Sequence, residues 1–115
     1  MAKRIVWLSI AAMAVAVALT LTPALAQDKV LINGFDAAYP PFSFVDKEGK
    51  PAGFDIDALN WIAAEMKFKV KHQPTDWAAI VPTLQAKKID VIASGMSITP
   101  ERQAAVNFTE PYWTV

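Results

Sequence analysis

Segments with the pattern of β-strands alternate with segments of helical pattern along most of this 115-residue chain, which leaves few folds open to it. Strand patterns fall at residues 30–35, 67–72 and 89–93, and an aromatic and β-branched run occupies residues 112–115. Helix patterns lie between these runs, in the order β-α-β-α-β-α-β. This order predicts an α/β fold with a mostly parallel sheet, helices on both faces, and ligands beyond the carboxyl ends of the strands.

Cap residues indicate where the first two helices begin. Asp55 is the expected N-cap of the first helix, and Thr75 or Asp76 that of the second. In the first helix, the apolar residues that recur at helical spacing and predict its buried face are Leu59, Ile62, Ala63 and Met66. Before this helix, the Pro40-Pro41 pair predicts an extended loop, and residues 46–51 a polar turn.

The first 26 residues have the pattern of a secretory signal peptide: a basic start, an apolar run over residues 5–21, and the small-residue exit Ala24-Leu25-Ala26. We therefore expect residues 1–26 to be cleaved and residues 27–115 to be a periplasmic, monomeric protein. A membrane anchor is the alternative, which Pro23 and the exit motif disfavour. The chain has no cysteine, which excludes disulfides and a lipid-bearing cysteine at the cleavage point.

Charge and residue types exclude several classes of function. Without Lys3 and Arg4, 9 of the 11 basic residues remain against 11 acidic ones, with no basic tract for nucleic acid. The sequence shows no metal-ligand cluster, phosphate loop or nucleophile elbow, so we expect neither a cofactor nor an enzyme. His72 is the single histidine and lies on an apolar strand face, which favours a hydrogen-bonded core histidine over a catalytic base.

Arg102 lies where helix electrostatics disfavour a cation. Thr99 has the hydroxyl of an N-cap and Pro100 suits the first helical position, so Arg102 falls at the third, near unpaired amide donors. It is also the only arginine outside the signal segment. With the Ser94 and Ser97 hydroxyls beside it, this guanidinium predicts an anchor for a carboxylate.

Two other interpretations stay open for the charged residues. Arg102 can instead form a surface ion pair with Glu101 or Glu110. Asp36, just beyond the first strand, can pair with a ligand cation or close a turn by accepting from its own backbone. Asp90, inside an apolar strand, is expected to bind neighbouring backbone amides.

Aromatic residues are candidates for the walls of the predicted crevice. Tyr39 flanks the diproline and Trp77 opens a helix, and for both a pocket role and a core role stay open. Phe42, Phe44 and Phe54 are expected in the core.

Taken together, these motifs resemble the amino-acid-type periplasmic solute-binding proteins of ABC importers, family 3 of the extracellular solute-binding proteins. The resemblance covers residues 30–115, and its motifs are Asp36 to Phe42, Gly53 to Asp57, Trp77 to Leu84, Lys88 to Asp90, Ser94 to Arg102, and Asn107 to Tyr112. It implies a fold of two α/β lobes that close on a ligand, of which residues 27–115 would be an incomplete first lobe. It implies a binding protein that delivers an amino acid to an inner-membrane ABC permease.

The resemblance also implies how the amino-acid end of a ligand is held. Arg102 would bind the α-carboxylate, helped by the amide and hydroxyl of Ser97. The carbonyl of Gly95, together with Ser94, would accept from the α-ammonium.

For the ligand side chain, the resemblance implies that Tyr39 and Trp77 sandwich it and that Asp36 suits a basic or polar end. Two alternatives remain: a periplasmic enzyme similar to cyclohexadienyl dehydratases, and a ligand-binding sensor domain of a membrane receptor.

Overall fold

The computed structural model describes residues 28–114. The predicted signal peptide, residues 1–26, lies outside the described residues. Within residues 28–114, none of the helices has the length and apolar character that crossing a bilayer requires.

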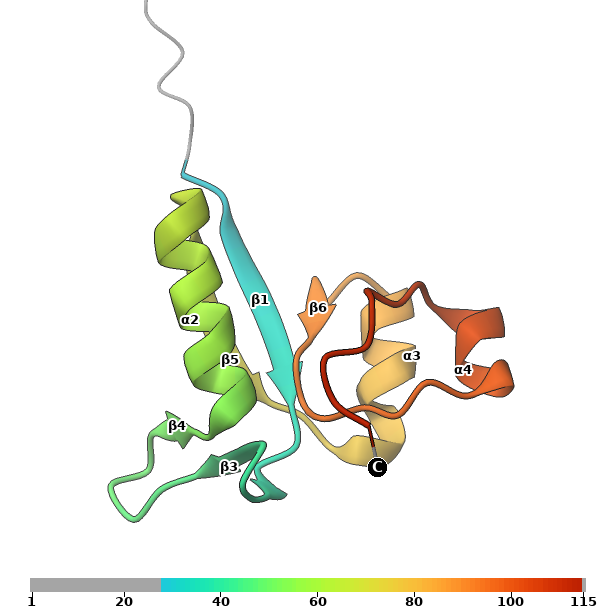
Figure 1. Cartoon of the computed structure of the whole chain (residues 1–115), viewed down its shortest axis with the longest axis horizontal. Helices are drawn as coiled ribbons and strands as arrows, with labels where there is room; N and C mark the ends of the chain where they lie inside the picture. The colour runs from blue at the N-terminus through green and yellow to red at the C-terminus, as the bar shows by residue number, and fades with distance from the viewer. Residues whose placement is uncertain (1–27, 115) are drawn as a thin grey trace, which may run out of the picture.

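A three-stranded parallel sheet forms the centre of the fold (Figure 1). It consists of β1 (Val30–Phe35), β5 (Lys69–Pro74) and β6 (Val91–Ile92) in the order β5-β1-β6. β1 pairs with β5 along its whole length and with β6 over two residues. Side chains of β5 alternate between exposed and partly buried over its first four residues, as expected for a half-buried edge strand.

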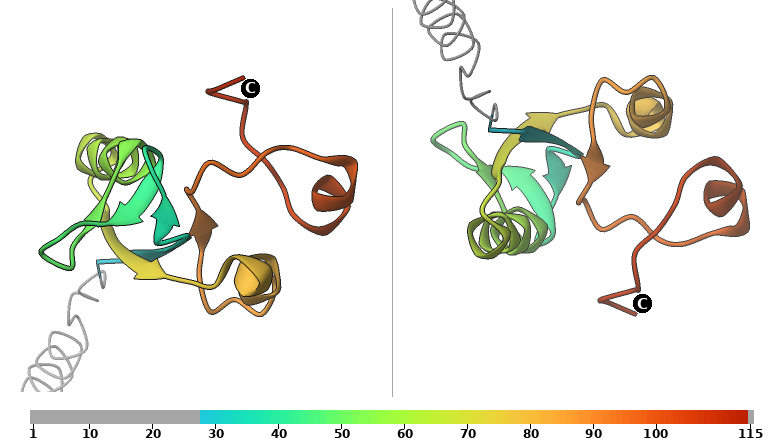
Figure 2. Two further views of the ribbon diagram at one scale, coloured as in Figure 1. Left: turned by 90° about the horizontal axis from the view of Figure 1, so that it is seen from below. Right: turned by 90° about the horizontal axis from the view of Figure 1, so that it is seen from above.

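Helices cover both faces of this sheet, as predicted. α2 (Phe54–Met66) packs on β5, whereas the short 3-10 helix η1 (Trp77–Ala79) continues into α3 (Ile80–Gln85), which packs on β1 and β6. Figure 2 shows α2 and α3 on opposite sides of the sheet. α4 (Pro100–Ala105) stands away from the sheet, beyond α3 (Figure 1). The core consists of Phe35, Ile56, Leu59, Ala63, Ile80 and Ile89.

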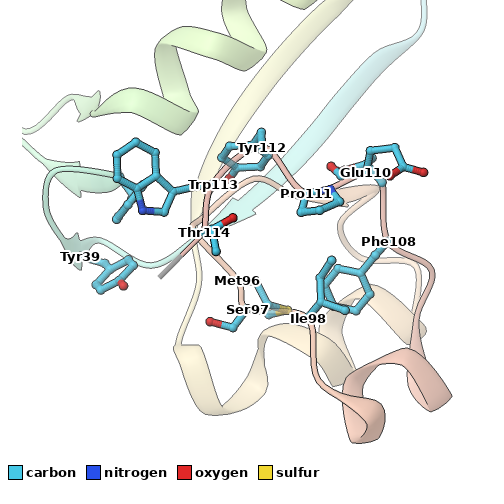
Figure 3. A pocket seen from close by; sticks show the side chains of 13 residues that line it. Tyr39, Met96, Ser97, Ile98, Phe108, Glu110, Pro111, Tyr112, Trp113 and Thr114 are labelled. Carbon is cyan, nitrogen blue, oxygen red and sulfur yellow. Dashed lines mark hydrogen bonds between the residues drawn. The ribbon is translucent and has the colours of Figure 1, made fainter.

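A second, antiparallel sheet was not predicted. It contains β2 (Ala38–Tyr39), β3 (Ser43–Val45) and β4 (Pro51–Ala52), in the order β2-β3-β4. Strands of two or three residues are too short to show an alternating pattern, and the diproline and the polar turn lie between them. This small sheet follows directly after β1 and places Tyr39 near the carboxyl end of the parallel sheet (Figure 3).

Several expectations about α2 are wrong. The N-cap is Gly53, with φ of 117°. Asp55 is the second residue of the helix, and its side chain is buried. The buried face of α2 consists of Asp55, Ile56, Leu59 and Ala63. Leu59 and Ala63 are thus buried as predicted, but Ile62 and Met66 are exposed. The physical reason is that Asp55 is used in a tertiary contact and not for capping.

Expectations for the aromatic residues and for the end of the chain also need correction. Phe54 is 53% exposed and stacks on Tyr112, while Phe42 and Phe44 are only partly buried. The predicted strand at 112–115 is absent over residues 112–114, because this segment makes side-chain contacts with Phe42 and Phe54 and no ladder to another strand.

The polar residues within the sheet behave largely as predicted. Asp90 accepts a hydrogen bond from the Ile32 amide at 2.8 Å, which ties β1 to the start of β6. The fully buried Asn33 accepts from the Ala93 amide at 2.7 Å, and its Nδ2 lies 3.1 Å from His72 Nδ1. His72 Nε2 lies 2.9 Å from Asn60 Oδ1. His72 is therefore hydrogen-bonded on both ring nitrogens, as a core histidine is expected to be.

Candidate functional site

The strand order places a crevice at one end of the parallel sheet. β1 lies between β5 and β6 in the sheet. The chain passes from β1 to β5 through α2 on one face and from β5 to β6 through α3 on the other, so the carboxyl ends of β1 and β6 form a topological switch point. Asp36 directly follows β1, and Ser94 follows β6 two residues later. The motif residues of both loops therefore meet at this edge.

Three polar residues fix the geometry of the two loops. The Asp36 amide donates to Ser94 Oγ at 2.8 Å, and Ser43 Oγ donates to the Asp36 carbonyl at 2.9 Å. The two serine hydroxyls lie 2.8 Å apart, and because Ser43 has used its one proton, Ser94 is the donor between them. Ser94 is 1% exposed, and its hydroxyl supports the loop through these hydrogen bonds. That Ser94 also contacts a ligand stays a prediction.

A cavity of about 400 Å³ lies against these loops (Figure 3). It is lined by Tyr39 and Phe42, by residues 95–98, and by residues 108–114. Tyr39 and Phe42 stack with their ring centroids 5.4 Å apart. Gly95 has φ of +61°, and a Cβ there would meet Tyr39 Cε1 at 2.8 Å, so the absence of a side chain lets the loop approach the rings.

Arg102 lies beside this cavity, at the start of α4. Thr99 caps the helix by accepting from the Arg102 amide at 3.2 Å, and Pro100 is the first helical residue, as predicted. The Arg102 guanidinium donates to the Ser97 carbonyl at 2.9 Å and lies 5.4 Å from the centroid of the Trp77 ring. These two contacts hold the guanidinium in place.

The alternative of a surface ion pair for Arg102 is not found. Among residues 28–114, the only salt bridge joins Lys69 to Asp28, so neither predicted glutamate pairs with Arg102. The guanidinium and Trp77 line a second cavity of about 380 Å³ between α3 and α4. A cation held by a carbonyl and an aromatic ring, without a carboxylate, keeps its capacity for an anionic ligand.

The predicted site residues thus fall around two neighbouring cavities. Tyr39, Gly95 and Ser97 line the larger one, Trp77 and Arg102 line the smaller one, and Met96 lines both. That Tyr39 and Trp77 sandwich one ligand stays a prediction. Asp36 Oδ1 accepts from the Ala38 amide at 2.9 Å, so the turn interpretation is realised, while its ligand role is still a prediction.

Sequence reasoning favoured a core role for Phe42, which lines the cavity. It missed several other residues that shape this region: Ser43, Asp55, Met96, Tyr112 and Trp113. Met96 lies between two predicted site residues, a signal that was available. Asp55 and Tyr112 are 57 residues apart in the chain and are joined by a hydrogen bond. No local pattern indicates such a contact.

Comparison with known proteins decides the family. The model of the bacterial extracellular solute-binding proteins, family 3, matches residues 31–115. The chain belongs to this family. The resemblance predicted from the motifs is confirmed.

This solute-binding protein is similar to several amino-acid-binding relatives. It is 41% identical over 100 residues to the L-arginine-binding protein of Pseudomonas aeruginosa, covering 87% of this chain and 39% of that protein. It is 43% identical over 77 residues to the lysine/arginine/ornithine-binding periplasmic protein of Escherichia coli K12, covering 67% of this chain and 30% of that protein. The chain thus spans less than two fifths of the length of these curated relatives.

Solved structures of the same kind confirm the α/β fold. An ancestral cationic amino acid solute-binding protein, AncCDT-1, matches with a TM-score of 0.70 and 50% identity over 73% of this chain and 37% of that one. Domain 1 from TmArgBP, in its arginine-bound form, matches with a TM-score of 0.70 and 44% identity over 73% of this chain and 65% of that one. An ancestral cyclohexadienyl dehydratase, AncCDT-3, also matches, at 39% identity.

Proposed function

We propose that this protein is the substrate-binding component of an ABC-type import system that captures a free amino acid in the periplasm and delivers it to the permease. The observation that carries the proposal is the Arg102 guanidinium, which is oriented by the Ser97 carbonyl and Trp77 and is unpaired with any carboxylate of the described residues. A guanidinium in this state suits the carboxylate that every free amino acid carries. The family and the names of its relatives support this assignment.

We further propose that the ligand has a basic side chain. The larger cavity combines the rings of Tyr39, Phe42 and Trp113 with the carboxylate of Glu110. Aromatic faces and a carboxylate both attract a cation. The relatives named for arginine, and for lysine, arginine and ornithine, support the same preference.

The predicted domain boundaries fit this role. In our proposal residues 1–26 direct export and residues 27–115 form part of the first lobe. The arginine-bound form of domain 1 from TmArgBP supports the idea that a single lobe of this family can hold its ligand.

A thermal-shift screen of the twenty amino acids and ornithine tests the proposal. A ligand that binds only the native state adds about 2.7 kcal/mol to the free energy of unfolding at a hundred times its Kd. We expect arginine, lysine or ornithine to raise Tm in a concentration-dependent way, and glutamate to have no effect. A folded protein whose Tm responds to none of the amino acids would contradict the proposal.

A dehydratase is the second candidate, because the ancestral cyclohexadienyl dehydratase has a similar fold and sequence. Incubation with prephenate distinguishes the two functions. Formation of phenylpyruvate would favour the enzyme, whereas unchanged prephenate together with saturable binding of an amino acid would favour the binding protein.

A further inference from the structure

A buried carboxylate links the start of α2 to the far end of the described chain. Asp55 is 2% exposed, and its Oδ1 accepts a hydrogen bond of 2.6 Å from the Tyr112 hydroxyl. Burial raises the pKa of the Tyr112 phenol, so the phenol stays protonated and acts as the donor. A short bond from a hydroxyl to a carboxylate belongs to the stronger class of hydrogen bonds.

The second oxygen of this carboxylate has an unusual setting. Asp55 Oδ2 is buried and has no hydrogen-bond partner among residues 28–114. Burial also raises the pKa of the Asp55 carboxyl, an effect that Tyr112 and the Gly95 backbone offset only in part. A buried unsatisfied oxygen is costly, so Asp55 is poorly explained as a stabilising residue of the core.

The segment that carries Tyr112 is one wall of the larger cavity. Residues 108–114 supply seven of the thirteen residues that line it. Figure 3 shows Tyr112 and Trp113 on this segment, together with Met96 and Ser97 of the site loop. The wall therefore has to be held in place if the cavity is to keep its shape.

Few contacts hold this wall. Tyr112 stacks on Phe54 with centroids 6.1 Å apart, and Trp113 meets Phe42 edge-on at 5.9 Å. Within the described part of the chain, the bond to Asp55 is the only side-chain hydrogen bond that joins residues 108–114 to another segment, and the backbone of Gly95 approaches the same Tyr112 hydroxyl. The backbone of the segment forms no ladder with a strand.

We propose that Asp55 is a positioning residue of the ligand cavity: through the Tyr112 hydroxyl it fixes residues 108–114 as a wall of the cavity, without contacting the ligand itself. The cost of its buried oxygen is then offset by an ordered binding site. The effect on ligand affinity rests on the function proposed above, whereas the ordering of the wall can be measured without any ligand.

The first measurement is ¹⁵N relaxation NMR on the ligand-free protein. Tyr112→Phe removes only the hydroxyl and keeps the ring that stacks on Phe54; because Tyr112 is 57% exposed, the core stays intact. We expect the order parameters of the amides in residues 108–114 to fall from about 0.85 to below about 0.6, with the rest of the chain unchanged. Asp55→Asn, which keeps an acceptor but loses the charge, should give a smaller fall.

Asp57→Asn is the matched control, since Asp57 lies in the same first turn of α2 but is exposed. It should leave the order parameters as they are in the unmodified protein. Unchanged order parameters in Tyr112→Phe would overturn the proposal.

The second measurement is the Kd for L-arginine by calorimetry. We expect Tyr112→Phe to raise it roughly tenfold and Asp57→Asn to leave it unchanged. A loosened wall with an unchanged Kd would overturn the positioning role. If the unmodified protein binds no amino acid, the proposed function fails, but the NMR result still decides whether Asp55 orders the wall. A purely structural role would lower Tm and change neither the order parameters of this segment nor the Kd.

Discussion

At the scale of single residues, the guanidinium of Arg102 contacts the Ser97 carbonyl and the Trp77 ring, and a lysine ammonium cannot make both contacts equally well. The guanidinium lies over the Trp77 ring while one N–H donates to the Ser97 carbonyl, which leaves other N–H groups for a carboxylate. We expect Arg102→Lys to weaken amino-acid binding roughly tenfold to a hundredfold, although charge is conserved. Calorimetry with L-arginine measures this, and circular dichroism checks that the fold is kept. An unchanged Kd would return Arg102 to a surface role.

Gly95 is required by both conformation and space. Gly95→Ala adds a Cβ at a φ of +61° that meets the Tyr39 ring at 2.8 Å. We expect a loss of about 1 to 3 kcal/mol in the free energy of unfolding, measured by urea denaturation, and weaker ligand binding.

Gly49→Ala is the matched control for this substitution. Gly49 also has a positive φ, of +79°, but nothing lies within 4 Å of a Cβ placed there. Its loss of stability measures the conformational cost alone, so the difference between the two variants measures the contact with Tyr39. Equal losses would mean that the close approach to Tyr39 is unimportant.

Residue-scale reasoning from sequence succeeded where the chemistry is local. The cap at Thr99 and the position of Arg102 follow from neighbours in the chain, and both are confirmed. The hydrogen bonds of the Ser94 hydroxyl to Asp36 and Ser43 were not predicted, and the ligand contact predicted for Ser94 stays a prediction. Ser43 lies 51 residues away in the sequence, and no spacing rule reveals that contact.

At the scale of elements, α4 is a six-residue helix whose start depends on one hydroxyl. Thr99→Ala removes the cap, which costs about 1 kcal/mol, and a helix this short frays as a result. We expect a higher Kd for the ligand even though the cap binds the backbone amide of Arg102 and not the ligand. Thr99→Ser, which keeps the hydroxyl, should restore binding in the same titration. If both variants bind alike, the cap does not set the position of Arg102.

Elements with a long pattern were predicted most completely, whereas the strand predicted at residues 89–93 is present only as the two residues of β6. β1, β5 and α2 span six or more residues each and were found, although the N-cap of α2 and its buried face were partly wrong. The error came from Asp55, because a carboxylate near a helix start suits capping and a tertiary contact equally well. β2 and β4 have two residues each, and their pairing depends on the tertiary structure.

At the scale of the whole molecule, a line of side chains crosses from α2 through β5 and β1 to the loop after β6. Asn33 uses its oxygen for the Ala93 amide, so its Nδ2 donates to His72 Nδ1, and Nε2–H of the neutral ring donates to Asn60. Burial accordingly lowers the pKa of His72 below its ordinary 6.5. Protonation of Nδ1 would oppose the Asn33 donor.

Stability should therefore fall with acid in a defined window. Between the lowered pKa and 6.5 the unfolded chain binds more protons than the native one, so the free energy of unfolding rises with pH there and is lost as pH falls below 6.5. Urea titrations between pH 7.5 and 5 measure this slope, and His72→Gln should flatten it. Since His72 is the only histidine, a slope that persists in the variant would contradict the assignment. Asp55, with its raised pKa, contributes a slope of opposite sign at lower pH.

The buried side chain of Asn33 also restricts which strand alignments the folding chain can accept. In the native pairing Asn33 lies opposite His72, and a shift of β5 by one residue would bring Lys71 or Gln73 there instead. The amide would then be buried without its partner, at a cost of about 1 to 3 kcal/mol. The hydrogen-bond partners of Asn33 lie 39 and 60 residues away in the chain. Asn33 can therefore select the native strand alignment only after these distant segments have come together. The same contacts thus favour the native register of the parallel sheet and, because they are long-range, are of the kind associated with slower folding.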